Sequence, residues 1–244
     1  MLSHDQGSAL SRRRFLVAGA ASAGALAVSA VAGARPAAAT TGYSLVVTNR
    51  SPQFQDVCLF QKAVDLGVPN AMPLAWLTAP LWPGKSTTFT WSVDYSFVWA
   101  LTGPLTGGVT FVPWDQVGAD QNDPRHDRIA LDYSSGTYGF VPASTGSNPP
   151  PGTLEIDVLP TVPEETASVG IGMSGGSVFA VQAEPGADLR FTPHPQYWVT
   201  AGTITAGEVL EIEEIRNEAE IPFDGTFSMQ ATLDSTNQWM VSPA

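Results

Sequence analysis

The sequence contains a single cysteine, Cys58, so no disulfide can form within the chain. Cys58 lies in the apolar stretch Val57–Phe60, which predicts a buried thiol that packs as a small hydrophobic side chain. No base stands beside it in the sequence, which argues against a cysteine nucleophile. The fold must therefore depend on apolar packing, for which seven Trp, five Tyr and eleven Phe residues are available.

Long apolar runs are also scarce, and the one candidate for a membrane span lies near the N-terminus. A membrane-spanning helix needs about 20 strongly apolar residues. The run Phe15–Val31 is shorter and consists mainly of the weakly apolar residues Ala, Gly and Val. The basic segment Ser11–Arg14 precedes this run, and the small residues Ala37–Ala39 follow it. This order is typical of a twin-arginine export signal, in which the small residues form the cleavage site. We expect a cleaved signal peptide over residues 1–39 and a secreted or extracytoplasmic mature chain, residues 40–244, without a membrane span. A general secretory signal and an uncleaved anchor are the alternatives.

Basic residues are few in the expected mature chain. Cleavage after residue 39 removes four of the eleven Lys and Arg residues and one of the twenty-three Asp and Glu residues, which leaves seven and twenty-two and a formal charge of −15. Nucleic acids and anionic lipid surfaces are bound through Lys and Arg side chains, so this charge argues against both as main partners. It fits a soluble extracellular protein and, less directly, a calcium-rich or cationic partner. The twin-arginine route exports folded proteins, which permits a cofactor but requires none, and we expect none.

Alternation of apolar and polar residues dominates residues 40–244, with Gly- and Pro-rich segments between the runs. In one such run Leu154, Ile156 and Val158 should face the core. Glu155 and Asp157 should then face the solvent. Many short strands at this spacing predict an all-β fold, either a single antiparallel β-sandwich or a barrel-like domain. The expected strands are Tyr43–Asn49, Asp56–Gln61, Ser86–Val93, Phe97–Leu101, Val109–Val112, Arg128–Tyr133, Thr153–Val158, Val169–Met173, Val178–Ala183, Tyr197–Thr200 and Thr226–Leu233.

Two segments need separate treatment. Glu208–Ala219 reads as a strand at Val209–Ile212 but also has apolar residues at helical spacing. Gly207 before it and Pro222 after it favour a strand with an acidic edge. The triple-proline segment 147–152 cannot continue a strand ladder, so it is either a crossover between sheets or an internal boundary.

Four stretches of the expected mature chain carry a family resemblance: Pro73–Leu77, Phe89–Trp99, Val169–Gly175 and Phe191–Trp198. Together they resemble the RhiA family, which is typified by rhizosphere-expressed proteins of rhizobia. The resemblance covers nearly all of residues 40–244 and implies one β-rich domain. It supplies no reaction and no catalytic or binding residues.

A serine-hydrolase motif is present in Gly172–Gly176, which matches the pattern G-x-S-x-G. Ser174, Asp188 and His194 follow in the chain order of the hydrolases that have a nucleophile elbow. That elbow needs a strand, a sharp turn and a helix, whereas Ser177–Val181 is strand-like. A β-hairpin in which Gly175 and Gly176 provide positive φ is the simpler interpretation. His194 lies between two prolines, and a structural corner is the simpler interpretation there too.

Two metal sites are conceivable from the residue types. His126 and His194, with Asp123 or Asp127, could bind zinc or copper if the fold joined them. Calcium could bind the oxygen-rich loop, although Pro124, Arg125 and Leu131 stand where an EF-hand has ligands or glycine. A solvated loop whose acids are offset by Arg125 and Arg128 is the alternative. The candidate ligands in this loop are Asp115, Asp120, Asn122, Asp123 and Asp127.

Tryptophan is abundant, and its positions suggest two roles. Trp91, on an alternating strand, should belong to the core. Trp82 and Trp114 lie in turns, where an exposed ring can stack on a sugar or a partner, although burial against a sheet edge is the simpler interpretation. Tyr197 and Trp198 are further candidate contacts. We therefore expect a secreted, non-catalytic protein that binds carbohydrate or another extracellular or envelope component. A hydrolase using Ser174 and His194, or a metal enzyme using His126 and His194, is the alternative.

Overall fold

The computed structural model describes residues 42–143 and 148–244, which belong to one compact unit, Ala38–Ala244. The expected signal peptide, residues 1–39, lies outside the described residues. The described residues form strands and one short 3₁₀ helix, η1 (Ile212–Glu214), so the all-β prediction is confirmed. In this part of the chain no helix has the length and apolar character needed to cross a membrane.

The strands form four sheets, and within each sheet every strand is hydrogen-bonded to the next one named. The first sheet contains β17 (Trp239–Pro243), β16 (Ser228–Leu233), β1 (Tyr43–Asn49) and β5 (Ser86–Trp91). The second contains β15 (Glu218–Ile221), β14 (Tyr197–Gly202), β2 (Gln55–Gln61) and β4 (Leu77–Leu81). The third contains β3 (Met72–Pro73), β12 (Gly176–Gln182), β11 (Ser168–Met173), β6 (Tyr95–Ala100) and β7 (Asp115–Ala119). The fourth contains β13 (Asp188–Phe191), β10 (Leu154–Val158), β8 (Arg128–Ser134) and β9 (Thr137–Val141).

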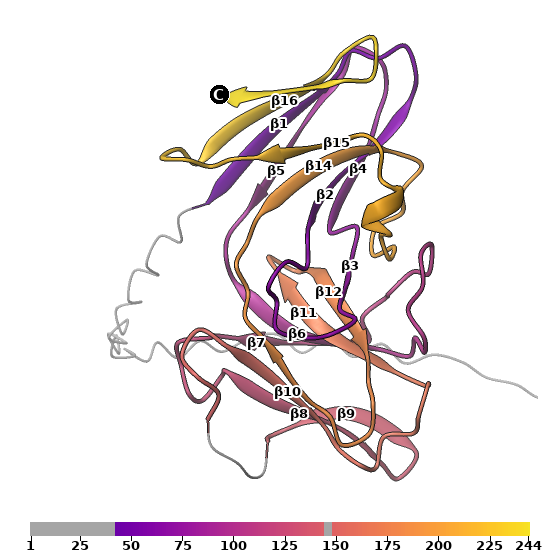
Figure 1. The fold of residues 1–244 in the computed structure, drawn as a ribbon, viewed down its shortest axis with the longest axis vertical. Coiled ribbons are helices and arrows are strands. Elements are labelled where there is room, and N and C mark those ends of the chain that lie inside the picture. The colour runs from indigo at the N-terminus through magenta and orange to yellow at the C-terminus, as the bar shows by residue number, and fades with distance from the viewer. Residues whose placement is uncertain (1–41, 144–147) are drawn as a thin grey trace, which may run out of the picture. The chain divides into compact units, whose positions relative to one another are not determined.

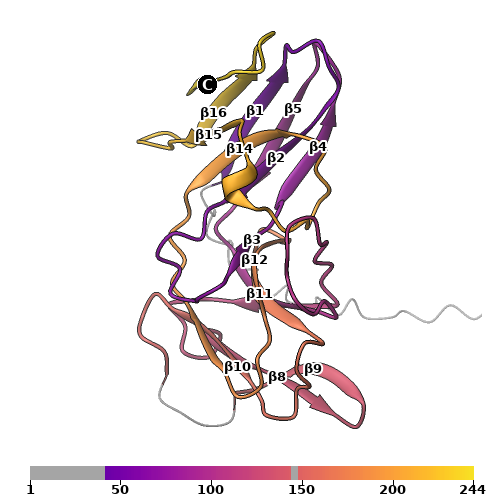
Figure 2. The ribbon, with the colours of Figure 1, turned by 45° about the vertical axis from the view of Figure 1, so that its right-hand side comes forward.

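Most neighbouring strands pair antiparallel, and each sheet has two end strands, so no sheet closes into a barrel. Two pairs are parallel, β1 with β16 and β8 with β10. The three prolines, Pro149–Pro151, lie in the connection between β9 and β10, two strands of the fourth sheet. Figure 1 and Figure 2 both place β1, β5 and β16 at one end of the unit and β8, β9 and β10 at the other.

Residues from all four sheets meet in one main apolar core, because alternate side chains of each strand face it. Leu154, Ile156 and Val158 of β10 are buried there, as alternation predicted. Trp91 and Cys58 are also buried, and burial raises the pKa of the Cys58 thiol to about 12. The prediction of a buried Cys58 thiol is therefore confirmed.

The expectation that Glu155 and Asp157 face the solvent is wrong. Both lie on the face of β10 opposite the core, but Glu155 is 1% and Asp157 8% exposed. Arg128 on the neighbouring strand β8 bonds Glu155 at 2.9 Å and Asp157 at 2.6 Å. Arg190 on β13 bonds Glu155 at 2.5 Å. The charges are therefore covered by one another's side chains rather than by water.

Two expected strands are also wrong. Val109–Val112 makes only an isolated bridge, between Thr110 and Glu208. Glu208–Ala219 is not one strand, because after a bridge at Val209 it turns through η1 and resumes as β15. The apolar residues of this segment do not alternate with polar ones. Three of them cover Cys58 and Phe60 on the outer face of the second sheet, namely Leu210, Ile212 and Ile215.

We predict that Arg128→Ala lowers the free energy of unfolding by about 3–5 kcal/mol, measured by urea denaturation, because it leaves Glu155 and Asp157 buried without their shared cation. Arg190→Ala is the matched control. The Arg190 side chain is 54% exposed and Glu155 would still have Arg128, so we expect a clearly smaller loss than in Arg128→Ala. Equal losses in the two variants would contradict this account of the network.

We predict that acidification toward the raised pKa values of two buried carboxyl groups stabilises the protein. Burial raises the pKa values of Asp127 and Asp157 above the ordinary 3.8, so the folded state takes up protons before the unfolded chain does. The contribution of these two protonated carboxyl groups to the free energy of unfolding is lost as the pH rises through their raised pKa values. Below about pH 4 the trend should reverse, because hydrogen bonds lower the pKa values of Asp123, Asp132 and Asp234 and these must then be protonated.

The measurement is the melting temperature of the wild type and of Asp127→Asn across this pH range. Asp127→Asn should flatten the rise on the acidic side of neutral. A wild-type melting temperature that falls steadily from pH 7 to pH 5 would contradict the assignment.

Candidate functional site

Trp114, directly before β7, is exposed but held in place. It is 68% exposed, its backbone N–H donates to the carbonyl oxygen of Trp99 at 2.9 Å, and the two indole rings stack with centroids 6.4 Å apart and planes 16° apart. Trp99 is 6% exposed and belongs to the main core. One face of the Trp114 ring therefore lies on a fixed ring, and the other faces the solvent.

The stack continues into the fourth sheet. Tyr138 of β9 lies 5.5 Å from Trp99, and Tyr133 of β8, its cross-strand partner, lies 4.5 Å from Tyr138. The Tyr138 hydroxyl bonds the Thr166 hydroxyl, which in turn donates to a backbone carbonyl at 2.8 Å. Aromatic pairs of this kind add about 0.5–1.5 kcal/mol each beyond their buried area. We call Trp114, Trp99, Tyr138 and Tyr133 the Trp114 platform.

Polar groups border the Trp114 platform. Asp115 of β7, the cross-strand partner of Trp99, is exposed, and one of its carboxylate oxygens accepts the Gln116 N–H at 2.8 Å. The Gln116 side chain lies on the opposite face of β7, where its amide donates to Ser96 Oγ at 2.7 Å. Asp132 of β8 accepts the hydroxyl of Thr161 at 2.5 Å, and this bond holds the pKa of Asp132 below its ordinary value. An exposed aromatic face beside fixed hydrogen-bonding groups suits a ring molecule with an apolar face and polar edges.

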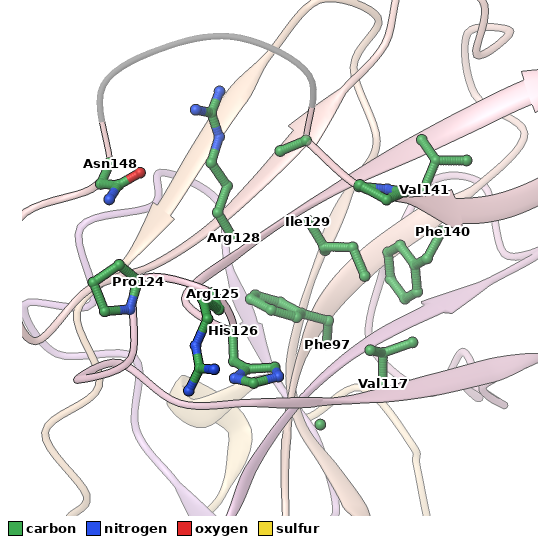
Figure 3. A pocket seen from close by; sticks show the side chains of 13 residues that line it. Phe97, Val117, Pro124, Arg125, His126, Arg128, Ile129, Phe140, Val141 and Asn148 are labelled. Carbon is green, nitrogen blue, oxygen red and sulfur yellow. The ribbon is translucent and has the colours of Figure 1, made fainter.

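A cavity of about 480 Å³, which we call the β7–β9 cavity, lies farther along the same strands. Figure 3 shows Phe97, Val117, Ile129 and Phe140 directed toward one another from β6, β7, β8 and β9. Pro124, Arg125, His126, Arg128 and Asn148 also line it. The cavity therefore has an apolar interior and a polar rim.

Both guanidinium groups at this rim are paired with carboxylates. Arg125 forms a two-bonded pair with Asp123, at 3.1 and 2.8 Å. Arg128 is held by Glu155 and Asp157. The rim therefore offers no excess positive charge to an anion.

Trp82 is the second exposed turn tryptophan, at 65% exposure. Its ring meets Phe54 edge-on, with centroids 4.9 Å apart and planes 62° apart. Buried Asn49 fixes both loops, because its side-chain amide donates to the carbonyl oxygens of Gln53 and Leu81, each at 2.9 Å. Burial of Trp82 and Trp114 against a sheet edge is therefore not what the structure shows.

Tyr197 and Trp198 are placed differently from the other two candidates. Tyr197 is 5% exposed inside an aromatic cluster that includes Trp91 and Phe223, and burial raises the pKa of its hydroxyl to about 12. Trp198 is half-buried under the Lys62 ammonium, 3.5 Å from its ring centroid, and Lys62 also pairs with Glu218. The structure thus gives Tyr197 no surface for a ligand and leaves Trp198 covered by a cation.

Ser174 lies in the hairpin turn between β11 and β12. Ser174 and Gly175 both have positive φ, at 51° and 82°, and a strand follows them where the nucleophile elbow needs a helix. The Ser174 hydroxyl oxygen accepts the N–H of Ser92 at 3.1 Å. In the described residues no hydrogen bond joins Ser174 to Asp188, the first residue of β13, or to His194 on the following loop.

The candidate metal ligands are engaged with one another and with backbone groups. Asp123 bonds Arg125 and contacts His126 Nδ1 at 2.9 Å, and these bonds, Arg125 first, hold the pKa of Asp123 well below its usual range. An oxygen of Asp120 accepts the Asn122 N–H at 2.9 Å, and Asp127 is buried nearby. Across residues 42–143 and 148–244 no three His, Cys, Asp or Glu side chains are grouped to hold a metal ion.

Comparisons with known proteins agree with the resemblance seen in the sequence. The RhiA family model matches residues 40–244. Protein RhiA of Rhizobium leguminosarum bv. viciae is 35% identical over 208 residues, which cover 84% of this chain and 87% of that protein. No solved structure shows a significant match. The chain therefore belongs to the RhiA family.

Proposed function

We propose that the protein is a secreted, non-catalytic binding protein whose Trp114 platform binds carbohydrate. The observation that carries this is the combination of high exposure and fixed orientation in Trp114. Its ring is 68% exposed and lies parallel to the buried ring of Trp99. A ring already ordered in the free protein loses less entropy on binding, and ordering a mobile side chain costs about 0.5–1.5 kcal/mol.

The neighbouring groups favour a sugar over a purely apolar ligand. A sugar ring has one face of C–H groups, which can stack on an indole, and hydroxyls at its edge, which need hydrogen-bond partners. Asp115, the residue after Trp114 and the cross-strand partner of Trp99, provides an exposed carboxylate as such a partner. The charge of −15 expected for the mature chain favours neutral or cationic sugars over uronates.

Two further observations support a secreted, non-catalytic role. The family match begins at residue 40, directly after the expected cleavage site, which is consistent with a separate export segment before it. The hairpin geometry around Ser174 lacks the helix and the base that an activated serine needs. Binding without catalysis is therefore the simpler function for this fold.

We predict that Trp114→Ala weakens binding to the preferred polysaccharide at least tenfold, because it removes the stacking face of the platform. The measurement is a depletion isotherm with purified mature protein on glucan, chitin, arabinogalactan and alginate. Trp114→Phe should keep part of the affinity, since a smaller ring can still stack. The free energy of unfolding should change by about 0.5–1.5 kcal/mol, the value of one aromatic pair.

Trp82→Ala is the matched control, because Trp82 is equally exposed but has only an edge-on neighbour. We expect its affinity to stay within threefold of wild type. A large loss in Trp82→Ala with none in Trp114→Ala would assign binding to the Phe54–Trp82 pair instead. A wild-type protein that binds none of the four polysaccharides would overturn the proposal.

A further inference from the structure

The β7–β9 cavity and the Trp114 platform lie along the same strands. Phe97 precedes Trp99 by two residues on β6, and Phe140 follows Tyr138 by two on β9. Side chains two apart on a strand share a face and lie about 7 Å from each other. Phe97 and Phe140 therefore lie on the same strand faces as Trp99 and Tyr138, at the end where the cavity begins.

The cavity interior is apolar on every strand that reaches it. Phe97 is 1% and Ile129 8% exposed, and both belong to the main core, whereas Val117 and Phe140 are half-buried against it. Figure 3 shows Val117 and Phe140 at the side of the cavity opposite Pro124 and Asn148. A volume of about 480 Å³ lies within the range of small-molecule sites. An apolar group placed there would remove the half-buried side chains of Val117 and Phe140 from water.

The rim does not select a charged group. Arg125 is neutralised by Asp123, and Arg128 by Glu155 and Asp157. His126 Nδ1 is also held by Asp123. A neutral apolar group meets no unpaired charge at this rim, whereas an anion would compete with carboxylates already in place.

We propose that the β7–β9 cavity binds the apolar substituent of a substituted sugar, so that the ligand class is a glycoside carrying an alkyl, acyl or aryl group. This rests on the proposed function, since the sugar ring of the same ligand stacks on Trp114. The substituent leaves the sugar along the partly exposed side chains of Tyr138, Val117 and Phe140. Each further methylene group buried in the cavity strengthens binding through the hydrophobic effect.

The experiment compares methyl and octyl β-glycosides of glucose, galactose and N-acetylglucosamine by calorimetric titration, with the octyl compounds kept below their micelle concentrations. We expect at least one octyl glycoside to bind tenfold or more tightly than its methyl counterpart. Phe140→Ala should reduce this preference to less than threefold and leave polysaccharide binding unchanged. Val117→Ser should act in the same direction, and Val112→Ser, at an exposed residue that does not line the cavity, should have no effect.

The outcomes separate this inference from the proposed function. If octyl and methyl glycosides bind equally while Trp114→Ala loses polysaccharide binding, the cavity assignment fails and the proposed function stands. If Phe140→Ala loses octyl glycoside binding while Trp114→Ala keeps it, the cavity assignment stands without the platform. If octyl preference is unchanged in both Phe140→Ala and Val117→Ser, with unchanged melting temperatures, the inference is wrong.

Discussion

The stacking of Trp114 on Trp99 joins the core of this protein to its surface. Trp99 is enclosed by the main core, and its carbonyl oxygen receives the N–H of Trp114 where β7 begins. Burial of a tryptophan removes about 150–250 Å² from water, so Trp99 is held in place by far more than one contact. The exposed ring thus takes its orientation from the core rather than from its own loop.

Several elements could be predicted because alternation is a local property. The strands at Tyr43–Asn49, Arg128–Tyr133 and Val169–Met173 lie within a residue or two of β1, β8 and β11. Alternation also separates the two sides of β10 correctly. It cannot show what covers the side that faces away from the core, because the covering side chains come from other strands. Arg128 and Arg190, on β8 and β13, are what bury Glu155.

The candidate site shows the same division between local and long-range information. The turn positions of Trp82 and Trp114 leave exposure and burial open and favour burial, whereas the structure exposes both rings. Tyr197 is buried, and the sequence carries a signal for this, because Tyr197 shares the parity of buried Val199 on β14. Trp99, Tyr138 and Tyr133 were missed as a group. Their proximity depends on how the third and fourth sheets meet, which no spacing along the chain reveals.

The acidic loop shows why a dense set of oxygen ligands need not form a metal site. Asp123 is already bonded to Arg125 and His126, whose positions two and three residues later make this a local arrangement. A cation would have to displace those partners and bring Asp120 and Asp127 toward the same point. Each carboxylate instead accepts a hydrogen bond or is buried at its own position. Residues of the same loop form part of the rim of the β7–β9 cavity.

Exposed tryptophans are unfavourable in a protein that has no use for them, because burying an apolar side chain gains about 25 cal/mol per Å². Trp82 and Trp114 nevertheless stay exposed, and each is fixed by a neighbouring ring and by hydrogen bonds to its loop. The strongly negative charge of the chain opposes the self-association that such rings would otherwise promote. Fixed apolar faces on a highly charged chain are compatible with solubility only while they remain few and separate. This constraint favours a ligand that is itself small or extended, and partly apolar, over a broad protein interface.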